Sequence, residues 1–204
     1  MGLNVNFNEK FRMAFEKKCF QLIIEAYQTS ITETVVQLDW NENDISSELH
    51  THIIANPLRA KWKVSTNVES HIANDIPKDK GFSNKYPRID FRLTSFISKY
   101  EYEYFFEAKN LKENDSALKH RYIHTGINNF VSQKYSNGSM IGYLLAGHPT
   151  ETVTGINSLL KKYKRDNEIL DLKSNKLYKF YYESAHGEIG ILKHLIFDFT
   201  QISN

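Results

Sequence analysis

A chain of 204 residues, of which 41% are hydrophobic and 25% charged, is long enough for one globular domain with a full core. A net charge of +2 excludes a strongly basic protein that coats nucleic acid, and no apolar run approaches the roughly 18 residues that a membrane helix needs. The single cysteine excludes an internal disulfide and a cysteine-based zinc site, and the N-terminus lacks a signal-peptide profile. We therefore expect a cytoplasmic protein that forms one domain, residues 1–204, and has no membrane partner.

The first half of the chain predicts helices followed by a strand. Residues 8–29 repeat apolar positions at spacings of three and four, which predicts an amphipathic N-terminal helical arm with Cys19 as buried filler. A shorter helix is expected at 44–56 and a strand at 61–68. Residues 69–87 are irregular, and a loop of that length inside a compact domain is either functional or mobile.

The second half of the chain predicts strands separated by helices. The expected elements are strands at 88–94, 100–109 and 140–147, helices at 116–135 and 149–165, and a C-terminal β-hairpin at 177–199. Gly126 lies within the first of these helices, where it predicts a kink or a close contact. The aromatic residues of the hairpin are expected to pack on the core, with pairing to a second subunit as the alternative; they are Tyr178, Phe180 and Tyr182. From about residue 44 to 147 the order is therefore helix, three strands, helix, strand.

The strand at 100–109 ends with two charged side chains on one face. Residues two apart in a strand point the same way, so Glu107 and Lys109 project together. If this strand pairs with the strand at 88–94 as a hairpin, the apolar residues of both strands share the opposite face. Asp90 then stands beside Glu107. The apolar residues expected on the shared face of the first strand are Ile89, Phe91 and Leu93.

These three charged residues suit one kind of chemistry. Two carboxylates that converge repel each other unless a cation lies between them, and oxygen ligands with open water positions suit Mg²⁺ or Mn²⁺. Such an ion polarises a phosphodiester and lowers the pKa of a bound water, while a lysine on the same face positions the water and offsets developing negative charge. Asp90, Glu107 and Lys109 are therefore a minimal set of groups for the hydrolysis of a phosphodiester.

An acid followed two residues later by a lysine is by itself a common pattern. It recurs at residues 16–18 and 171–173. Only at 107–109 is it combined with strand alternation and a carboxylate on the preceding strand. The alternative interpretation is a solvated strand face with cross-strand ion pairs.

The order of elements, together with Pro87-Arg88-Ile89-Asp90 and Glu107-Ala108-Lys109, resembles the PD-(D/E)XK nuclease superfamily, whose members have a restriction-endonuclease-like fold. The resemblance covers about residues 44–147, and it departs from the pattern in that two residues separate the proline from the aspartate. It implies an α/β domain with an αβββαβ core and a mixed sheet, extended here by the N-terminal helical arm at 8–29 and the hairpin at 177–199.

The resemblance also implies roles for individual residues. Asp90 and Glu107 would ligate Mg²⁺ or Mn²⁺, the backbone carbonyl of Ala108 could add a ligand, and Lys109 would position water and stabilise charge. Many members have a further glutamate on the helix before the first strand. Glu48 is the candidate for it, with Glu69 as a weaker competitor.

Other polar residues are weaker candidates. Members of the superfamily often use a polar residue of the helix after the motif, which makes Arg121 and Gln133 candidates for contact with substrate phosphate, against the alternative of a solvated helix face. The pair His50 and His52 diverges on a helix and is not expected to bind one metal together. The histidines of the last hairpin are expected to have core or surface roles; they are His186 and His194.

The resulting hypothesis is a Mg²⁺-dependent endonuclease that acts on nucleic acid, with DNA favoured over RNA. By analogy we expect a small phage-defence or mobile-element effector, which gains specificity from a homodimer or from a protein partner that activates it. The alternatives are a non-cleaving subunit of the same fold that binds or scaffolds nucleic acid, an RNase, and an unrelated α/β interaction protein.

Overall fold

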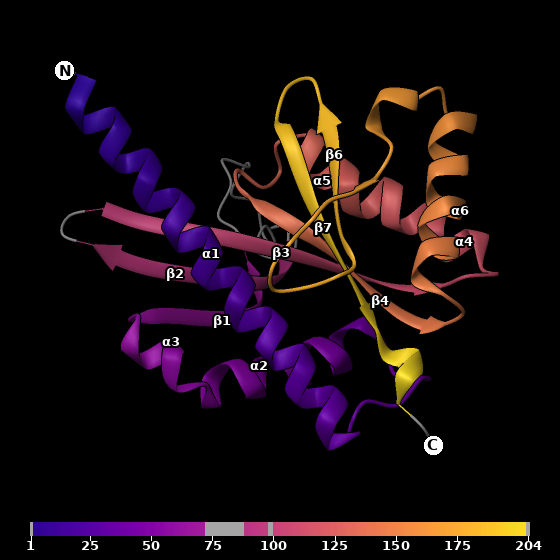
Figure 1. The fold of residues 1–204 in the computed structure, drawn as a ribbon, viewed down its shortest axis with the longest axis horizontal. Helices are drawn as coiled ribbons and strands as arrows, with labels where there is room; N and C mark the ends of the chain where they lie inside the picture. The colour runs from indigo at the N-terminus through magenta and orange to yellow at the C-terminus, as the bar shows by residue number, and fades with distance from the viewer. Residues whose placement is uncertain (1, 72–87, 98–99, 203–204) are drawn as a thin grey trace, which may run out of the picture.

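The computed structural model describes residues 2–71, 88–97 and 100–202. Most of the irregular segment predicted at 69–87 lies outside these residues. The described chain is a mixed α/β domain in which one sheet separates two layers of helices (Figure 1).

The sheet has seven strands in the order β1-β2-β3-β4-β7-β6-β5. They are β1 (Val64–His71), β2 (Arg88–Ile97), β3 (Tyr100–Lys112), β4 (Gly138–Ala146), β5 (Asp171–Leu172), β6 (Tyr181–His186) and β7 (Gly190–Asp198). The first three strands form an antiparallel meander, β3, β4 and β7 run parallel, and β6 and β5 add antiparallel strands. The predicted C-terminal hairpin is thus a continuation of the core sheet.

One face of the sheet is covered by the N-terminal helices, α1 (Gly2–Glu33), α2 (Glu42–Ala55) and the short α3 (Pro57–Lys61). Helix α1 crosses the sheet obliquely, as Figure 1 shows, and is buried against it from Phe15 onward. Tyr27 stacks on Phe197 of β7, with ring centroids 4.4 Å apart, and Cys19 is fully buried as expected. The predicted arm is therefore longer than expected. Its buried apolar residues from Phe15 to Tyr27 belong to the first hydrophobic cluster, the core between the N-terminal helices and the sheet.

The other face is covered by α4 (Ser116–Arg121), a π-helix η2 (Tyr122–Ile127), α5 (Asn128–Val131) and α6 (Pro149–Lys162). The single helix predicted at 116–135 is thus interrupted by π-helical geometry and is shorter than expected. The close contact expected at Gly126 is present, because a Cβ there would lie 2.4 Å from Cε of Met140. This glycine lets the helix approach β4 closely.

The C-terminal aromatic residues pack on the core, as predicted. Tyr178 and Tyr182 are buried. Phe180 is partly buried between the first hydrophobic cluster and the second hydrophobic cluster, which is the core between the sheet and the layer formed by η2, α5 and α6. Only Tyr182 of these three lies in β6, which begins at Tyr181, later than the predicted strand. The short 3₁₀ helices η3 (Asp166–Glu168) and η4 (Phe199–Gln201) flank this part of the sheet.

Ile89 departs from the predicted alternation of β2. Phe91 and Leu93 pack with the first cluster, but Ile89 packs with the second cluster, on the other side of the sheet. Glu69, which the β1–β2 register places opposite Asp90, has φ of +48°, outside the region of a regular strand. The break in alternation therefore coincides with an irregularity in the neighbouring strand, next to Asp90.

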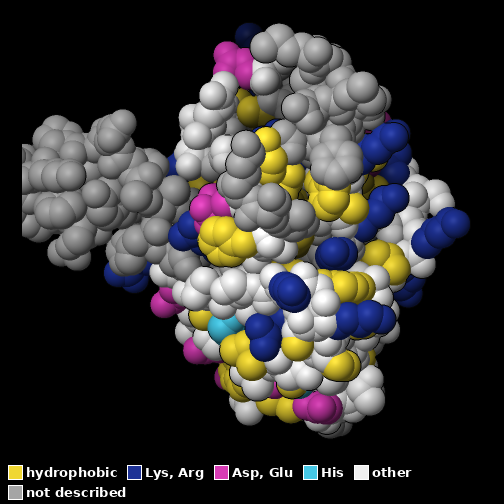
Figure 2. Space-filling model, turned by 90° about the vertical axis from the view of Figure 1, so that its left-hand side faces the viewer, with side chains coloured by type: hydrophobic (Ala, Val, Ile, Leu, Met, Phe, Trp, Pro, Cys, Tyr) yellow, Lys and Arg dark blue, Asp and Glu magenta, His cyan; other side chains and the backbone are white. Residues whose placement is uncertain are grey.

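Two properties of the described chain bear on its partners. No helix in it combines the length and apolar character needed to span a membrane. On the face drawn in Figure 2, Lys and Arg side chains outnumber acidic ones and lie among apolar residues. That face would attract an anionic partner more readily than the net charge of +2 suggests.

Candidate active site

Glu107 and Lys109 lie in the middle of the sheet, on a strand that pairs with β2 on one side and β4 on the other. Both point to the face covered by η2 and α5, while Ala108 between them packs in the first cluster. Only 5% of Glu107 and 7% of Lys109 is exposed to solvent. The predicted alternation is therefore present, but its charged face is buried, which contradicts the alternative of a solvated strand face.

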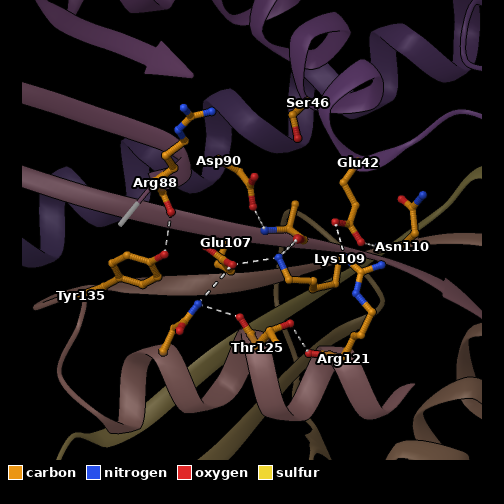
Figure 3. A network of polar contacts seen from close by, with 12 residues as sticks. Glu42, Ser46, Arg88, Asp90, Glu107, Lys109, Asn110, Arg121, Thr125 and Tyr135 are labelled. Carbon is orange, nitrogen blue, oxygen red and sulfur yellow. Dashed lines mark hydrogen bonds and ion pairs between the residues drawn. The ribbon is translucent and has the colours of Figure 1, made fainter. Parts of the chain in front are cut away.

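The Asp90 side chain bonds to the backbone of β3 at the point where β2 and β3 separate. Regular pairing of β2 with β3 begins at Phe91↔Phe106, one residue beyond Asp90 and Glu107. Oδ2 of Asp90 accepts a hydrogen bond of 2.6 Å from the backbone N–H of Ala108 (Figure 3). This bond fixes one Asp90 oxygen and holds the carboxyl group beside the Glu107–Lys109 segment, as the hairpin pattern predicts.

The ammonium group of Lys109 is held by its own strand. Nζ donates to Oε1 of Glu107 at 2.8 Å and to the backbone carbonyl of Ala108 at 2.7 Å (Figure 3). The other carboxylate oxygen of Glu107, Oε2, is buried and receives no hydrogen bond from the described residues, because the nearby Tyr135 hydroxyl donates its one proton to the backbone carbonyl of Arg88. A buried carboxylate oxygen without a partner is costly, so Oε2 marks a position suited to a further cation or donor.

The electrostatics of the site are those of an excess of buried carboxylates. Burial, and then the charge of Glu107, raise the pKa of Asp90 to about 7, although Lys109 and the Ala108 N–H act in the opposite direction. Burial alone would lower the pKa of Lys109, but Glu107 and Asp90 outweigh it and raise that pKa. One ammonium therefore does not compensate two carboxyl groups, and Asp90 retains a proton well above its usual range.

Glu42, which the sequence analysis missed, lies at this site. It begins α2, and its Oε1 accepts a hydrogen bond of 2.9 Å from the backbone N–H of Asn110, the residue after Lys109. Its Oε2 lies 3.0 Å from a guanidinium nitrogen of Arg121. The charge of Glu42 also raises the pKa of Asp90. The signal for Glu42 was the capping box Asn41–Asp44, which starts the helix two residues earlier than predicted.

The structure places Glu48 in a different group of residues. Its Oε1 lies 3.0 Å from Nε2 of His52 on the next turn, and Oε2 of Glu33, the last residue of α1, lies 3.8 Å from the same nitrogen. Their donor atoms lie within 4.8 Å of one another, the only group of three His, Cys, Asp or Glu residues so close in the described chain. Glu42 and Glu48 are six positions apart, about 240° around a helix, so one helix cannot turn both toward β3.

The remaining predicted residues lie around the site at different distances from it. Arg121 is half-exposed and contacts Glu42, while Gln133 is exposed beyond the end of α5. Glu69 is exposed on the edge strand β1. His50 and His52 diverge as expected, because His50 contacts the backbone of Thr66 and His52 the carboxylates described above.

Two further residues support Glu107 from the helical layer. Nδ2 of Asn129 donates to the backbone carbonyl of Thr125 at 2.6 Å and approaches Oε1 of Glu107 at 3.4 Å. The hydroxyl of Tyr135 donates to the backbone carbonyl of Arg88, and its pKa is raised by burial and by Glu107. Asn129 is thus the polar residue that the helix presents to the site. Helical periodicity in the sequence could not predict its position, because the π-helix η2 changes the direction of the side chains that follow it.

A cleft of about 640 Å³ adjoins the site at the carboxyl end of β3. Its lining includes Glu42, Asn110, Lys112 and Arg121. The lining also holds Asp39 and Asp44, so three carboxylates face two basic side chains there, and Arg121 is paired with Glu42.

The groups of this site match the requirements of a hard divalent cation. Glu107 Oε2 lacks a partner, Asp90 is poorly compensated, and the nearby donors are carboxylate and carbonyl oxygens. Comparisons of the chain with family models, with curated proteins and with solved structures found no match. The function of the chain therefore has to be inferred from the geometry of these residues.

Proposed function

We propose that this protein is a metal-dependent nuclease that hydrolyses phosphodiester bonds, with DNA as the favoured substrate. The observation that carries the proposal is the buried Glu107, which has one carboxylate oxygen on Lys109 and the other without a partner, beside the poorly compensated Asp90. The order α2, α3, β1, β2, β3, α4–α5, β4 is the order expected of an αβββαβ core of the restriction-endonuclease-like fold with the short α3 added, and it supports the same proposal.

Each residue has a defined role in the proposed reaction. Asp90 and Glu107, with the Ala108 carbonyl, would hold Mg²⁺ or Mn²⁺, and Glu42 completes the acidic lining of the site. When bound, the cation would polarise the phosphodiester and lower the pKa of a water molecule. Lys109 supplies the positive charge that offsets the negative charge developing on the phosphate oxygens.

Secondary contacts keep these groups in place and exclude water. The Ala108 N–H orients Asp90, and Asn129 approaches the Glu107 oxygen that Lys109 also contacts. The aromatic ring of Tyr135 closes the site on the side of Arg88. Arg121 and Lys112 in the adjoining cleft are the cations best placed to contact backbone phosphates.

The test is a cleavage assay with purified protein on supercoiled plasmid, single-stranded DNA and RNA, each with Mg²⁺, Mn²⁺ or EDTA. We expect cutting that needs the metal and is lost in Lys109→Ala and Glu107→Gln. Glu103→Gln is the matched control, because Glu103 lies on the same face of β3 but forms a partly exposed ion pair with Arg92.

The pattern of cleavage distinguishes the remaining alternatives. Cutting of RNA alone would identify an RNase. No cutting, with metal binding that depends on Asp90 and Glu107, would point to a required partner, such as a second copy or an activating protein in a phage-defence or mobile-element setting. No cutting and no metal binding would overturn the proposal and favour a non-catalytic scaffold.

A further inference from the structure

We propose that Lys109 is a built-in counter-ion that occupies the place of the metal, and that cation binding displaces it and so prepares it for catalysis. This inference rests on the proposed function and adds a regulatory step to it. Two of the three groups assigned as metal ligands, the Glu107 carboxylate through Oε1 and the Ala108 carbonyl, accept hydrogen bonds from Nζ of Lys109, at 2.8 and 2.7 Å. Oε2 of Glu107 has no partner among the described residues and is the oxygen left open to an incoming cation.

Burial explains why the ammonium takes this position. A carboxylate that is only 5% exposed is unstable without a cation, and Lys109 is the buried cation that contacts Glu107. A backbone carbonyl and a carboxylate oxygen held a hydrogen bond away from one nitrogen can equally converge on a small metal ion. Lys109 therefore satisfies, without metal, two of the oxygens at the site, while Oε2 of Glu107 stays open.

The charges favour an exchange between the two cations. Asp90 and Glu107 together carry up to two negative charges, but the Lys109 ammonium contacts Glu107 alone, while Asp90 accepts only the backbone N–H of Ala108 among the contacts of the described residues. A divalent cation matches two carboxylates. Once it is present, repulsion between like charges a few ångströms apart drives Nζ away from Glu107.

The environment of Lys109 allows this movement. Its four-carbon stem is flexible, and it packs beside Gly126 of η2, which has no side chain and whose Cβ, if present, would lie 3.7 Å from Cγ of Lys109. Nζ released from Glu107 stays beside the cation, where the scissile phosphate would bind. Metal loading and the delivery of the catalytic lysine are thus one event.

The experiment measures metal binding, independently of cleavage. Isothermal titration with Mn²⁺ and with Ca²⁺ is performed on the full chain and on Lys109→Met, Glu107→Gln and Lys161→Met. Lys161 is exposed near the end of α6, away from the Glu107 contact, and is the control for the loss of one lysine charge. We expect Lys109→Met to bind Mn²⁺ about tenfold tighter or more, because it loses a competing charge-assisted hydrogen bond. Lys161→Met should match the unmodified protein.

The outcomes separate this inference from the proposed function. Binding by the unmodified protein that is equal to or tighter than binding by Lys109→Met would overturn the exchange and leave the metal site standing. Absence of binding in both proteins would overturn the metal site itself, and the exchange with it.

A second measurement does not depend on a variant that folds. Reductive methylation of the unmodified protein, read by mass spectrometry, is compared in EDTA and in Ca²⁺. Lys109 should be protected in EDTA and become reactive in Ca²⁺, while Lys112 reacts in both. Equal protection of Lys109 in both conditions would contradict the exchange.

Discussion

Two of the buried polar clusters on the sheet differ in how their groups are paired. The first is the candidate site around Glu107, where one carboxylate oxygen has no hydrogen-bond partner among the described residues. The second, the histidine network, runs through the helical layer and the C-terminal strands and consists of Tyr122, His194, Ser184, His186 and Glu168. Nδ1 of His186 also lacks a hydrogen bond of good geometry, but it lies 2.7 Å from a carboxylate oxygen of Glu168. Both are buried at similar depth, so burial alone does not distinguish a site from a structural feature.

The histidine network forms a continuous chain of contacts. The Tyr122 hydroxyl lies 2.9 Å from Nδ1 of His194, whose Nε2 lies 2.7 Å from the Ser184 hydroxyl. The same hydroxyl lies 2.7 Å from Nε2 of His186, whose Nδ1 lies 2.7 Å from a carboxylate oxygen of Glu168. If every hydrogen points toward the ionised Glu168, each link has one donor and one acceptor.

The network contains a serine, a histidine and an acid in the order of a hydrolase triad, but it is structural. Ser184 is only 2% exposed, and its hydroxyl contacts two imidazoles, so a substrate carbonyl could not reach it. His186 and His194 thus have the core roles that the sequence suggested. Their partner Glu168 comes from η3, which the sequence analysis did not predict.

The pKa directions of the two clusters are opposite. In the network, burial lowers the pKa of His194 to about 3, so it stays neutral, and Arg165 overcomes burial to lower the pKa of Glu168. In the candidate site, burial and a like charge raise the pKa of Asp90. In both clusters burial favours the neutral form of the group, but only in the site does a neighbouring carboxylate add to the effect of burial. Two buried acids side by side favour the binding of a cation between them, and the variants described next distinguish the two clusters.

Asp90→Asn gives the largest expected effect. Asparagine can still accept the Ala108 N–H, but it removes a charge that the metal needs, so cleavage should fall about a thousandfold or more. The measurement is the rate of plasmid cleavage at saturating Mn²⁺. If Asp90→Asn kept its activity, Asp90 would not be a metal ligand. His186→Gln, in the histidine network, is the control and should cleave at the rate of the unmodified protein.

Ser184→Ala should lower the stability of the protein and leave its cleavage rate nearly unchanged. It leaves two buried imidazole nitrogens without partners, so the free energy of unfolding should fall by about 2 to 3 kcal/mol while the cleavage rate stays within twofold. Urea unfolding checks the stability. Ser158→Ala, on the exposed face of α6, is the control and should change stability by less than about 0.5 kcal/mol. Equal effects of the two variants would show that the network is not structural.

The pH dependence of stability should also separate the clusters. The pKa of Asp90 is about 7 when folded against an ordinary 3.8, so its contribution is complete below about pH 4 and is lost as the pH rises toward 7. In EDTA, Asp90→Asn should therefore gain stability over the unmodified protein between pH 4 and pH 8, by the order of a few kcal/mol. His194 acts with the opposite sign, because its lowered pKa removes stability as the pH falls from 6.5 toward 3. A difference in unfolding free energy that stays constant across this range would contradict the assigned environment of Asp90.

The parts of the fold that the sequence predicted are those with strong local periodicity. The alternation of β3 located Glu107 and Lys109 on one face, and the apolar stripe of α1 located Cys19 in the core. What the sequence did not reveal depends on contacts between distant segments. Such features are the position of Ile89, set beside an irregular β1, and the role of Asn129, set by π-helical geometry.

The smallest expected effect is that of the glutamate on α2, for which the sequence suggested Glu48 and the structure places Glu42 at the site. It tests directly a contact between distant segments that the sequence did not predict. Glu42→Gln keeps an oxygen for the Asn110 N–H but loses charge near Asp90, so cleavage should fall about tenfold, as for other residues that orient metal ligands. Glu48→Gln, which alters only the His52 and Glu33 group, should leave the rate unchanged. Steady-state rates of both variants at saturating Mn²⁺ provide the measurement. The reverse pattern would return the role to Glu48 and would require α2 to turn relative to β3 when substrate binds. If instead both rates fell, the two helix faces would be coupled through α2, and the histidine–glutamate group at its far side would belong to the functional machinery.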